Sequence, residues 1–253
     1  MKLEIVSLPG EEVNIAALHY IPEKDRQPTA LLFAHGFTSG KYSLDLLASY
    51  MALKGYEGLT FDFVGHKLGA TGGEMRHTDQ AVSNLKDALV WLRHNTQAAH
   101  VVLVGHSMGA AASLAVAAEE CSPSSDPALP HLAGLVCMCM GLEPSKGFTG
   151  AIGRAMLTQR SDYVAGAPAL QLLKELETLV LAADEIDALP ALFIAARQDV
   201  LIPVERVEAL AARVGTSASV VVIEASHLEA PDRSRAALIH WLEAQGLNNR
   251  PYE

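Results

Sequence analysis

The chain has 253 residues, half of them hydrophobic and 19% charged, with a formal net charge of −10. This composition is typical of a globular protein, long enough for one α/β domain with a large core or for two small domains, and it excludes a disordered chain. The acidic balance favours solubility and argues against nucleic acid or an anionic membrane surface as a partner. The sequence carries no apolar signal segment and no apolar run of membrane-spanning length, so we expect a cytoplasmic protein.

The first half of the chain alternates strand-like runs with helical patterns. Two short runs separated by Pro9-Gly10-Glu11-Glu12 predict an antiparallel pair. The run at 29–34 is apolar almost throughout, which favours a central strand covered on both faces. The elements expected here are strands at 3–8, 14–20, 29–34 and 57–63 and helices at 42–54 and 79–95.

The second half largely continues this alternation. An apolar run from Val101 passes through a tight turn into an Ala-rich run that ends at Ala117, which predicts a strand, a turn and a helix. Further strands are expected at 132–140, 191–196 and 219–224, and further helices at 168–183, 203–214 and 231–245. The eight strands and their alternating helices predict an α/β fold, with a mostly parallel sheet and helices on both faces.

Residues 141–189 interrupt this order, because they contain only one clear helical pattern between two strands. We interpret the segment as a small cap inserted over the C-terminal edge of the sheet. Residues 1–140 and 190–253 would then form the core domain. A long crossover connection is the alternative interpretation.

The tight turn carries the pattern Gly105-x-Ser107-x-Gly109, between a predicted strand and a predicted helix. This is the nucleophile-elbow pattern, and it lies in the strand–turn–helix context that this motif requires. Such a turn projects the serine hydroxyl out of the sheet, and its crowded backbone needs neighbours that are nearly free of side chains. The alternative is a glycine-flanked turn in which Ser107 only caps the helix.

A serine nucleophile needs a base within hydrogen-bond reach, and that base needs an acceptor to orient it. In open parallel sheets such groups lie at the carboxyl ends of strands. Asp199 directly follows the strand expected at 191–196, and we predict it to be the orienting acid. His227 follows the strand expected at 219–224, and we predict it to be the general base. The strongest rival base is His66, in a glycine-rich loop, although holding that loop is its favoured role.

Other polar and sulfur-containing residues are less well placed for a role in this site. Asp184 and Asp187 compete with Asp199, but they precede a strand rather than follow one. The three cysteines are an odd number without disulfide spacing. Cys137 and Cys139 alternate along an apolar run, so we expect them on one face of a strand as buried core residues, with a metal site as the less favoured alternative.

Two backbone N–H groups are predicted to stabilise a developing oxyanion. Met108 begins a helix directly after Ser107, where the first N–H groups have no intrahelical partner. Phe37 follows Gly36 in the loop after the third strand, and a glycine there lets the backbone approach a substrate.

Taken together, these motifs resemble the α/β-hydrolase superfamily, on the serine-carboxylesterase side, and the resemblance covers nearly the whole chain apart from the proposed cap. It implies an eight-stranded α/β-hydrolase sheet, to which the proposed small cap would be an insertion, an acyl-enzyme mechanism, and neither a metal nor an organic cofactor. One loop departs from the family pattern Asp-x-x-Gly-His-Gly-x-Ser, since Lys67-Leu68-Gly69 follows the histidine here. The matched positions are His35-Gly36-Phe37, Asp62 with Gly65-His66, residues 105–109, Asp199 and His227.

The expected function is hydrolysis of a small-molecule carboxylic ester with a small or medium apolar acyl group. Phe37 and two leucines of the proposed cap helix, Leu172 and Leu176, are expected to bind the substrate. Thioesterase, acylglycerol lipase and carbon–carbon bond hydrolase are alternatives that use the same three groups. A non-catalytic binding protein with the hydrolase fold is an alternative of another class, against which the intact Ser, Asp and His set argues.

Overall fold

The computed structural model describes residues 1–120, 129–186 and 188–248. Within these residues eight strands form one sheet in the order β1-β2-β4-β3-β5-β6-β7-β8. The strands are β1 (Lys2–Leu8), β2 (Ile15–Ile21), β3 (Thr29–Ala34), β4 (Glu57–Phe61), β5 (His100–His106), β6 (His131–Met138), β7 (Ala191–Ala196) and β8 (Ala218–Ile223). The pairings β1 with β2 and β2 with β4 are antiparallel, and all the others are parallel. The predicted α/β fold is therefore confirmed.

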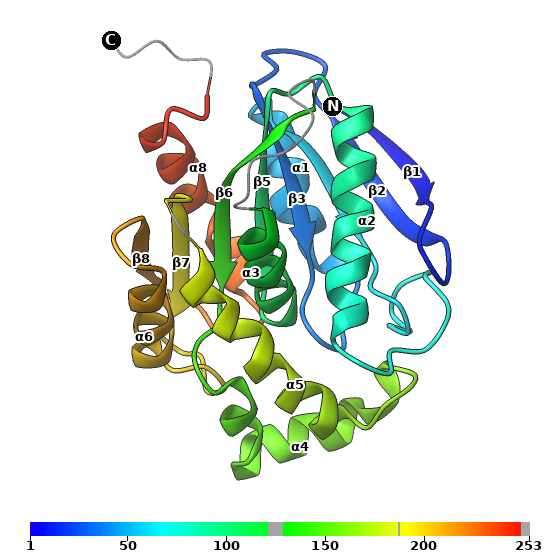
Figure 1. The fold of residues 1–253 in the computed structure, drawn as a ribbon, viewed down its shortest axis with the longest axis vertical. Coiled ribbons are helices and arrows are strands. Elements are labelled where there is room, and N and C mark those ends of the chain that lie inside the picture. The colour runs from blue at the N-terminus through cyan, green and yellow to red at the C-terminus, as the bar shows by residue number, and fades with distance from the viewer. Residues whose placement is uncertain (121–128, 187, 249–253) are drawn as a thin grey trace.

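Helices cover both faces of the sheet (Figure 1). They are α1 (Asp45–Leu53), α2 (Asp79–Asn95), α3 (Met108–Glu120), α4 (Ala151–Arg160), α5 (Ala169–Leu181), α6 (Val204–Val214), α7 (Ala230–Arg233) and α8 (Arg235–Ala244), with 3₁₀ turns η1 (Lys41–Leu44), η2 (Pro144–Phe148), η3 (Ser161–Tyr163) and η4 (Ala182–Glu185). No helix in the described part of the chain is long and apolar enough to cross a bilayer.

The alternation of side chains along β3 explains the two helical layers. Leu31 and Phe33 join one buried cluster with residues of α1 and α8, on one side of the sheet. Ala30 and Leu32 point the other way and join a second cluster with residues of α2, α3, α5 and α6. Because both faces of the central strands are covered, these strands are apolar throughout rather than alternating.

Two segments differ from the expected elements. The sequence pattern does not predict α4, because the run is short and Gly153 lies inside it. Packing explains this glycine, since a Cβ at position 153 would lie 2.2 Å from the carbonyl oxygen of Gly147 in η2. The single helix predicted at 231–245 is divided into α7 and α8 at Ser234, whose hydroxyl donates to the carbonyl of Pro231.

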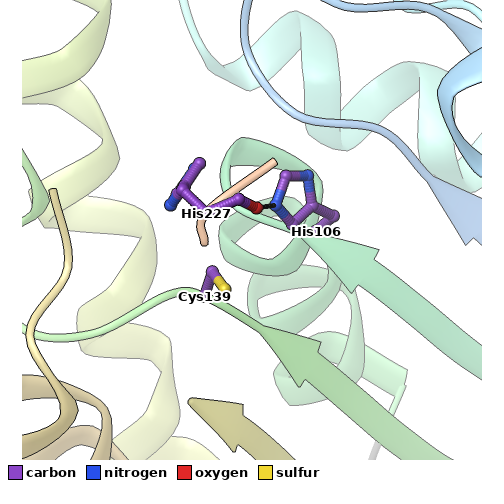
Figure 2. Close-up of side chains that lie close together, drawn as sticks. All are labelled: His106, Cys139 and His227. Atoms are coloured by element: carbon purple, nitrogen blue, oxygen red, sulfur yellow. Dashed lines mark hydrogen bonds between the residues drawn. The ribbon is translucent and has the colours of Figure 1, made fainter. Parts of the chain in front are cut away.

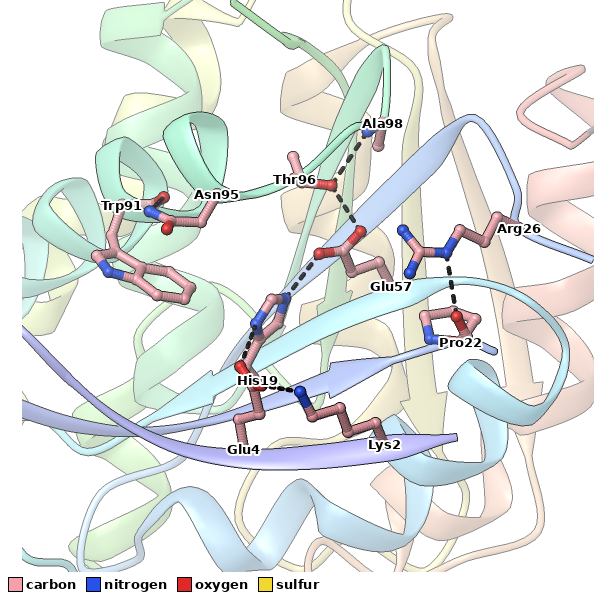
Figure 3. Close-up of polar contacts among 10 residues, drawn as sticks. All are labelled: Lys2, Glu4, His19, Pro22, Arg26, Glu57, Trp91, Asn95, Thr96 and Ala98. Atoms are coloured by element: carbon pink, nitrogen blue, oxygen red, sulfur yellow. Dashed lines mark hydrogen bonds and ion pairs between the residues drawn. The ribbon is translucent and has the colours of Figure 1, made fainter. Parts of the chain in front are cut away.

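A buried polar cluster ties the antiparallel edge of the sheet to the end of α2 (Figure 3). His19 Nε2 lies 2.7 Å from Glu57 Oε1, and its Nδ1 lies 4.0 Å from Glu4 Oε2. The other oxygen of Glu57 accepts a hydrogen bond from the Thr96 hydroxyl, and the ring of Trp91 meets His19 edge-on at 5.3 Å. These contacts join three strands and a helix, so His19 belongs to the framework.

A buried ion pair anchors the loop that departs from the family pattern. Asp62, which follows β4, is fully buried, and its Oδ2 lies 2.5 Å from Lys41 Nζ. The same carboxylate accepts the backbone N–H groups of Lys41 and Ala70 at 2.6 and 2.7 Å. A Cβ at Gly69 would lie 2.2 Å from the Asp62 Cγ, so only glycine lets the loop close over the carboxylate.

Replacing Asp62 by asparagine should lower the free energy of unfolding by about 3–5 kcal/mol, because it leaves the buried ammonium of Lys41 without its counter-charge. Urea denaturation of both proteins measures the change. The matched control is Asp184→Asn, which breaks an exposed pair with Arg213 and should change stability little. An equally small effect at both aspartates would contradict an anchoring role for Asp62.

Candidate active site

Ser107 occupies a strained turn between β5 and α3. Its φ of 52° lies in the left-handed region, which non-glycine residues seldom adopt. A Cβ at Gly105 would lie 2.4 Å from the Ala110 Cα, and one at Gly109 would lie 2.2 Å from the Ala34 carbonyl oxygen. Both glycines of the pattern are therefore required by packing. The Ser107 side chain remains partly exposed.

His227 and Asp199 meet across the ends of two neighbouring strands. The Nδ1 atom of His227 lies 2.7 Å from Asp199 Oδ2, and both residues are largely buried. The other carboxylate oxygen accepts the backbone N–H groups of Leu201 and Ile202. Burial raises the pKa of Asp199, but the hydrogen bond and charge of His227 and the two backbone donors outweigh it, so the pKa lies below its ordinary value. The carboxylate is thus held ionised beside Nδ1 of the imidazole.

Ser107 and His227 both line a cleft with about 420 Å³ of space, part of it open to solvent. Phe37 also lines the cleft, as the sequence predicts for a substrate-binding residue. The described residues that line the cleft are Phe37, Thr38, Ser107, Phe148, Met156, Leu157, Arg160, Leu201, His227 and Leu228.

The two predicted oxyanion donors lie beside this cleft. Met108 is the first residue of α3 and directly follows Ser107. Phe37 lines the cleft and directly follows Gly36, which passes close to the serine. A Cβ on Gly36 would lie 3.3 Å from the Ser107 Cβ. Within the described residues, neither the Phe37 nor the Met108 backbone N–H donates to a protein acceptor.

The rival residues lie elsewhere. His66 is fully buried, with Nδ1 3.1 Å from the carbonyl oxygen of Val64, and it does not line the cleft. Asp184 forms a surface ion pair with Arg213, far from the environment expected of an orienting acid. Asp187 lies outside the described residues.

His106 and Cys139 pack against His227. The sequence predicts that Cys139 is buried, but it does not predict that either residue contacts His227. His106 Nε2 lies 2.9 Å from the backbone carbonyl oxygen of His227, and Cys139 Sγ lies beside them (Figure 2). The two cysteines do not share one strand face. Cys137 lies in β6 within the larger core, whereas Cys139 follows the strand with φ of 52° and joins a separate small cluster.

One nitrogen or sulfur atom from each of His106, Cys139 and His227 lies within 4.8 Å of the others, which is a spacing that a metal could bridge. The chemistry of the three groups does not favour this. Burial, and then the nearby carboxylate of Asp199, raises the pKa of the Cys139 thiol well above its ordinary value, so this thiol keeps its proton at neutral pH. Nδ1 of His227 is bonded to Asp199, and Nε2 of His106 is bonded to the backbone. His106 and Cys139 therefore pack against His227.

The structure places Leu172 and Leu176 away from the cleft. Both are almost fully buried, at 1% and 2% exposure, in the core cluster that α5 shares with α3. The apolar wall of the cleft comes instead from η2 and α4, through Phe148, Met156 and Leu157. The sequence signal for this wall is weak, because α4 itself was not predicted.

Acid should destabilise the fold as the pH falls from 6.5 to about 4, because three histidines are buried in the neutral form. Burial lowers the pKa of His106 and of His66 to about 3, and that of His35 to about 4. In the unfolded chain each would titrate near 6.5. Below pH 6.5 the unfolded state therefore binds more protons than the folded state. The stability that these neutral histidines contribute is fully present above pH 6.5 and is lost on acidification.

The expected loss is about 1.4 kcal/mol per pH unit for each histidine, or about 4 kcal/mol per pH unit for all three at the steepest point. Urea denaturation at pH 7, 6 and 5 measures it. A midpoint that does not move over this range would show that these side chains are charged or exposed.

A profile of the alpha/beta hydrolase family matches residues 31–237. No curated protein matches the chain. Among solved structures, an esterase of Pyrococcus furiosus is similar with a TM-score of 0.72 and 21% identity, covering 96% of this chain and 91% of that one. The esterase domain of a Rhodothermus marinus protein has a TM-score of 0.68 and 23% identity, covering 96% and 99%. A thioesterase domain from the curacin biosynthetic pathway has a TM-score of 0.66 and 14% identity, covering 96% and 100%. The structural likenesses show a shared fold, and because the family profile spans most of the sequence, the chain belongs to the alpha/beta hydrolase family.

Proposed function

We propose that the protein is a serine hydrolase that cleaves carboxylic esters through an acyl-enzyme formed on Ser107. The observation that carries this proposal is the arrangement of three groups. Ser107 and His227 line one cleft, and Nδ1 of His227 is hydrogen-bonded to the buried carboxylate of Asp199. Two of the structural neighbours, from Pyrococcus furiosus and Rhodothermus marinus, are an esterase and an esterase domain, which supports the same reaction class.

The proposed reaction follows from the roles of these groups. His227 Nε2 takes the hydroxyl proton as Ser107 Oγ attacks the ester carbonyl, and the carbonyl electron pair moves onto its oxygen. The N–H groups of Phe37 and Met108 stabilise that oxyanion, and each such donor is worth about 10²–10³ in kcat. Collapse expels the alcohol, which takes its proton from His227. Water then releases the acid by the same sequence of steps.

We also propose that residues 141–189 act as a small cap that sets acyl-length preference. Support comes from η2 and α4, which supply Phe148, Met156 and Leu157 to the cleft. These three side chains are apolar and only partly buried, so a small or medium apolar acyl group would cover them.

Leu157→Ala should shift the preferred acyl length of the substrate while leaving the smallest ester nearly unaffected, because it enlarges the cleft without touching the reacting groups. Leu172→Ala is the matched comparison on α5. It should lower stability by about 2–5 kcal/mol and leave the acyl preference of the folded protein unchanged. A series of p-nitrophenyl esters of increasing chain length measures the preference. A change in preference with Leu172→Ala alone would contradict this assignment.

A fluorophosphonate probe tests the central proposal directly. The native protein should be labelled on Ser107, as located by peptide mass spectrometry, and labelling should abolish hydrolysis of p-nitrophenyl butyrate. Parallel assays with oxygen esters and thioesters separate esterase from thioesterase activity. Labelling at another residue, or no labelling of folded protein, would overturn the proposal and favour a non-catalytic binding protein.

A further inference from the structure

Among the described residues that line the cleft, Arg160 is the only permanently charged side chain. It is the last residue of α4, and it shares the cleft with Ser107 and His227. No aspartate or glutamate lines the cleft beside it. The remaining wall is mostly apolar, so a half-buried cation is chemically out of place there unless something pairs with it.

The contacts of Arg160 leave most of its donors unused. Nη1 donates one hydrogen bond to the Thr38 hydroxyl at 3.3 Å, and the guanidinium lies over the ring of Tyr163 at 5.4 Å. Within the described part of the chain no carboxylate forms an ion pair with it, although acidic residues outnumber basic ones by 29 to 19. A guanidinium carries five N–H donors in a fork that matches a carboxylate.

The place of Arg160 at the C-terminal end of α4 explains why a positive charge is favourable there, but it does not explain why the side chain lines the cleft. Cations are favourable near helix C-termini, and a residue facing solvent would serve that purpose. Arg160 instead reaches Thr38, the residue that follows the oxyanion donor Phe37. Its head group is therefore held over the cleft, close to the loop that would bind the ester.

We infer that Arg160 binds a carboxylate at the far end of the substrate, so that the preferred substrates are esters carrying a second, anionic carboxyl group. This inference rests on the proposed ester hydrolysis and specifies its substrate class. A single cation suits a group with one negative charge. A phosphate, with nearly two charges and three acceptor oxygens, is usually held by several donors. An apolar wall with one cation at its end suits a short hydrocarbon chain that ends in a carboxylate.

The test compares anionic and neutral esters of matched length. The acyl arm uses the p-nitrophenyl monoesters of glutaric and adipic acid against p-nitrophenyl esters of linear fatty acids, with spontaneous hydrolysis subtracted. The alcohol arm uses butyrate esters of short hydroxy acids against butyrate esters of plain alcohols. We expect the wild-type protein to prefer the anionic ester in one arm, with the preference greatest at one chain length, because the cation is fixed in position.

Arg160→Gln should lower kcat/KM for the anionic ester by about 10- to 100-fold while changing that for the neutral ester by less than about 3-fold. Arg160→Lys, which keeps the charge but loses the fork, should retain part of the preference. Arg154→Gln is the matched control, because Arg154 is an exposed arginine of the same helix that does not line the cleft. Raising the salt concentration should weaken the preference in every protein that keeps a cation at position 160, and should leave the ratio of the two rates unchanged in Arg160→Gln.

The outcomes separate this inference from the proposed function. If no ester is hydrolysed in a reaction that depends on Ser107, the proposed function fails. If neutral esters are hydrolysed and Arg160→Gln slows neutral and anionic esters equally, Arg160 merely positions the loop through Thr38, and the inference is wrong. Equal rates for anionic and neutral esters in both arms of the wild-type comparison would also overturn it.

Discussion

Ser107→Ala should lower kcat for ester hydrolysis by about 10⁴-fold or more while leaving the protein folded. The Ser107 hydroxyl lies at the strained turn before α3 and lines the same cleft as His227, so alanine removes the proposed nucleophile. Alanine removes it without adding volume, so the close packing of the elbow against Ala34 and Ala110 is kept. Steady-state kinetics with p-nitrophenyl butyrate and loss of fluorophosphonate labelling measure the effect.

The control for this variant is its thermal stability. The alanine inherits the left-handed backbone of Ser107, so the melting temperature should remain close to that of the wild-type protein. Ser113→Ala is a matched comparison in α3, because this buried serine donates to the backbone carbonyl of Gly109 and does not line the cleft. Full activity in folded Ser107→Ala would remove the central claim.

Asp199→Asn should lower kcat by about 10³–10⁴-fold, because it imposes the wrong tautomer on His227. One oxygen of Asp199 accepts the N–H groups of Leu201 and Ile202, so the oxygen of an asparagine would remain there. Its amide NH₂ would then face His227 Nδ1 and donate to it. The imidazole proton would move to Nε2, which could no longer accept the proton of Ser107.

The same kinetic assay measures this loss, and fluorophosphonate labelling should slow in parallel because it needs the same proton transfer. Asp184→Asn serves as the control, since this surface aspartate has no contact with the cleft. A folded Asp199→Asn protein with kcat within a few-fold of the wild type would show that another group orients the base. His66→Gln is the decisive companion variant, and we expect it to retain activity if it folds.

The main framework of the fold could be predicted from the amino-acid order because its signals are local. Apolar runs buried on both sides, such as Thr29–Ala34, predict central strands wherever they occur. The glycines at 105 and 109 flank a serine at a predicted strand-to-helix turn, and this pattern is visible in the sequence alone. The crowding at Gly105 comes from the neighbouring residues 109 and 110, whereas that at Gly109 comes from the Ala34 carbonyl and appears only in the folded chain. The positions of Asp199 and His227 follow from the rule that parallel strands carry their functional groups at their carboxyl ends.

The wall of the cleft could be decided only by the tertiary structure. The apolar stripe of α5 could face either the cleft or the core, and burial of Leu172 and Leu176 against the α3 layer selects the core. Helix α4 then covers the cleft, although its sequence predicts no helix. Its close contact with η2 depends on Gly153, whose neighbour Gly147 is identified only in the folded chain. The hydrophobic effect has no direction, so sequence periodicity shows that a helix has an apolar face but not which surface that face will meet.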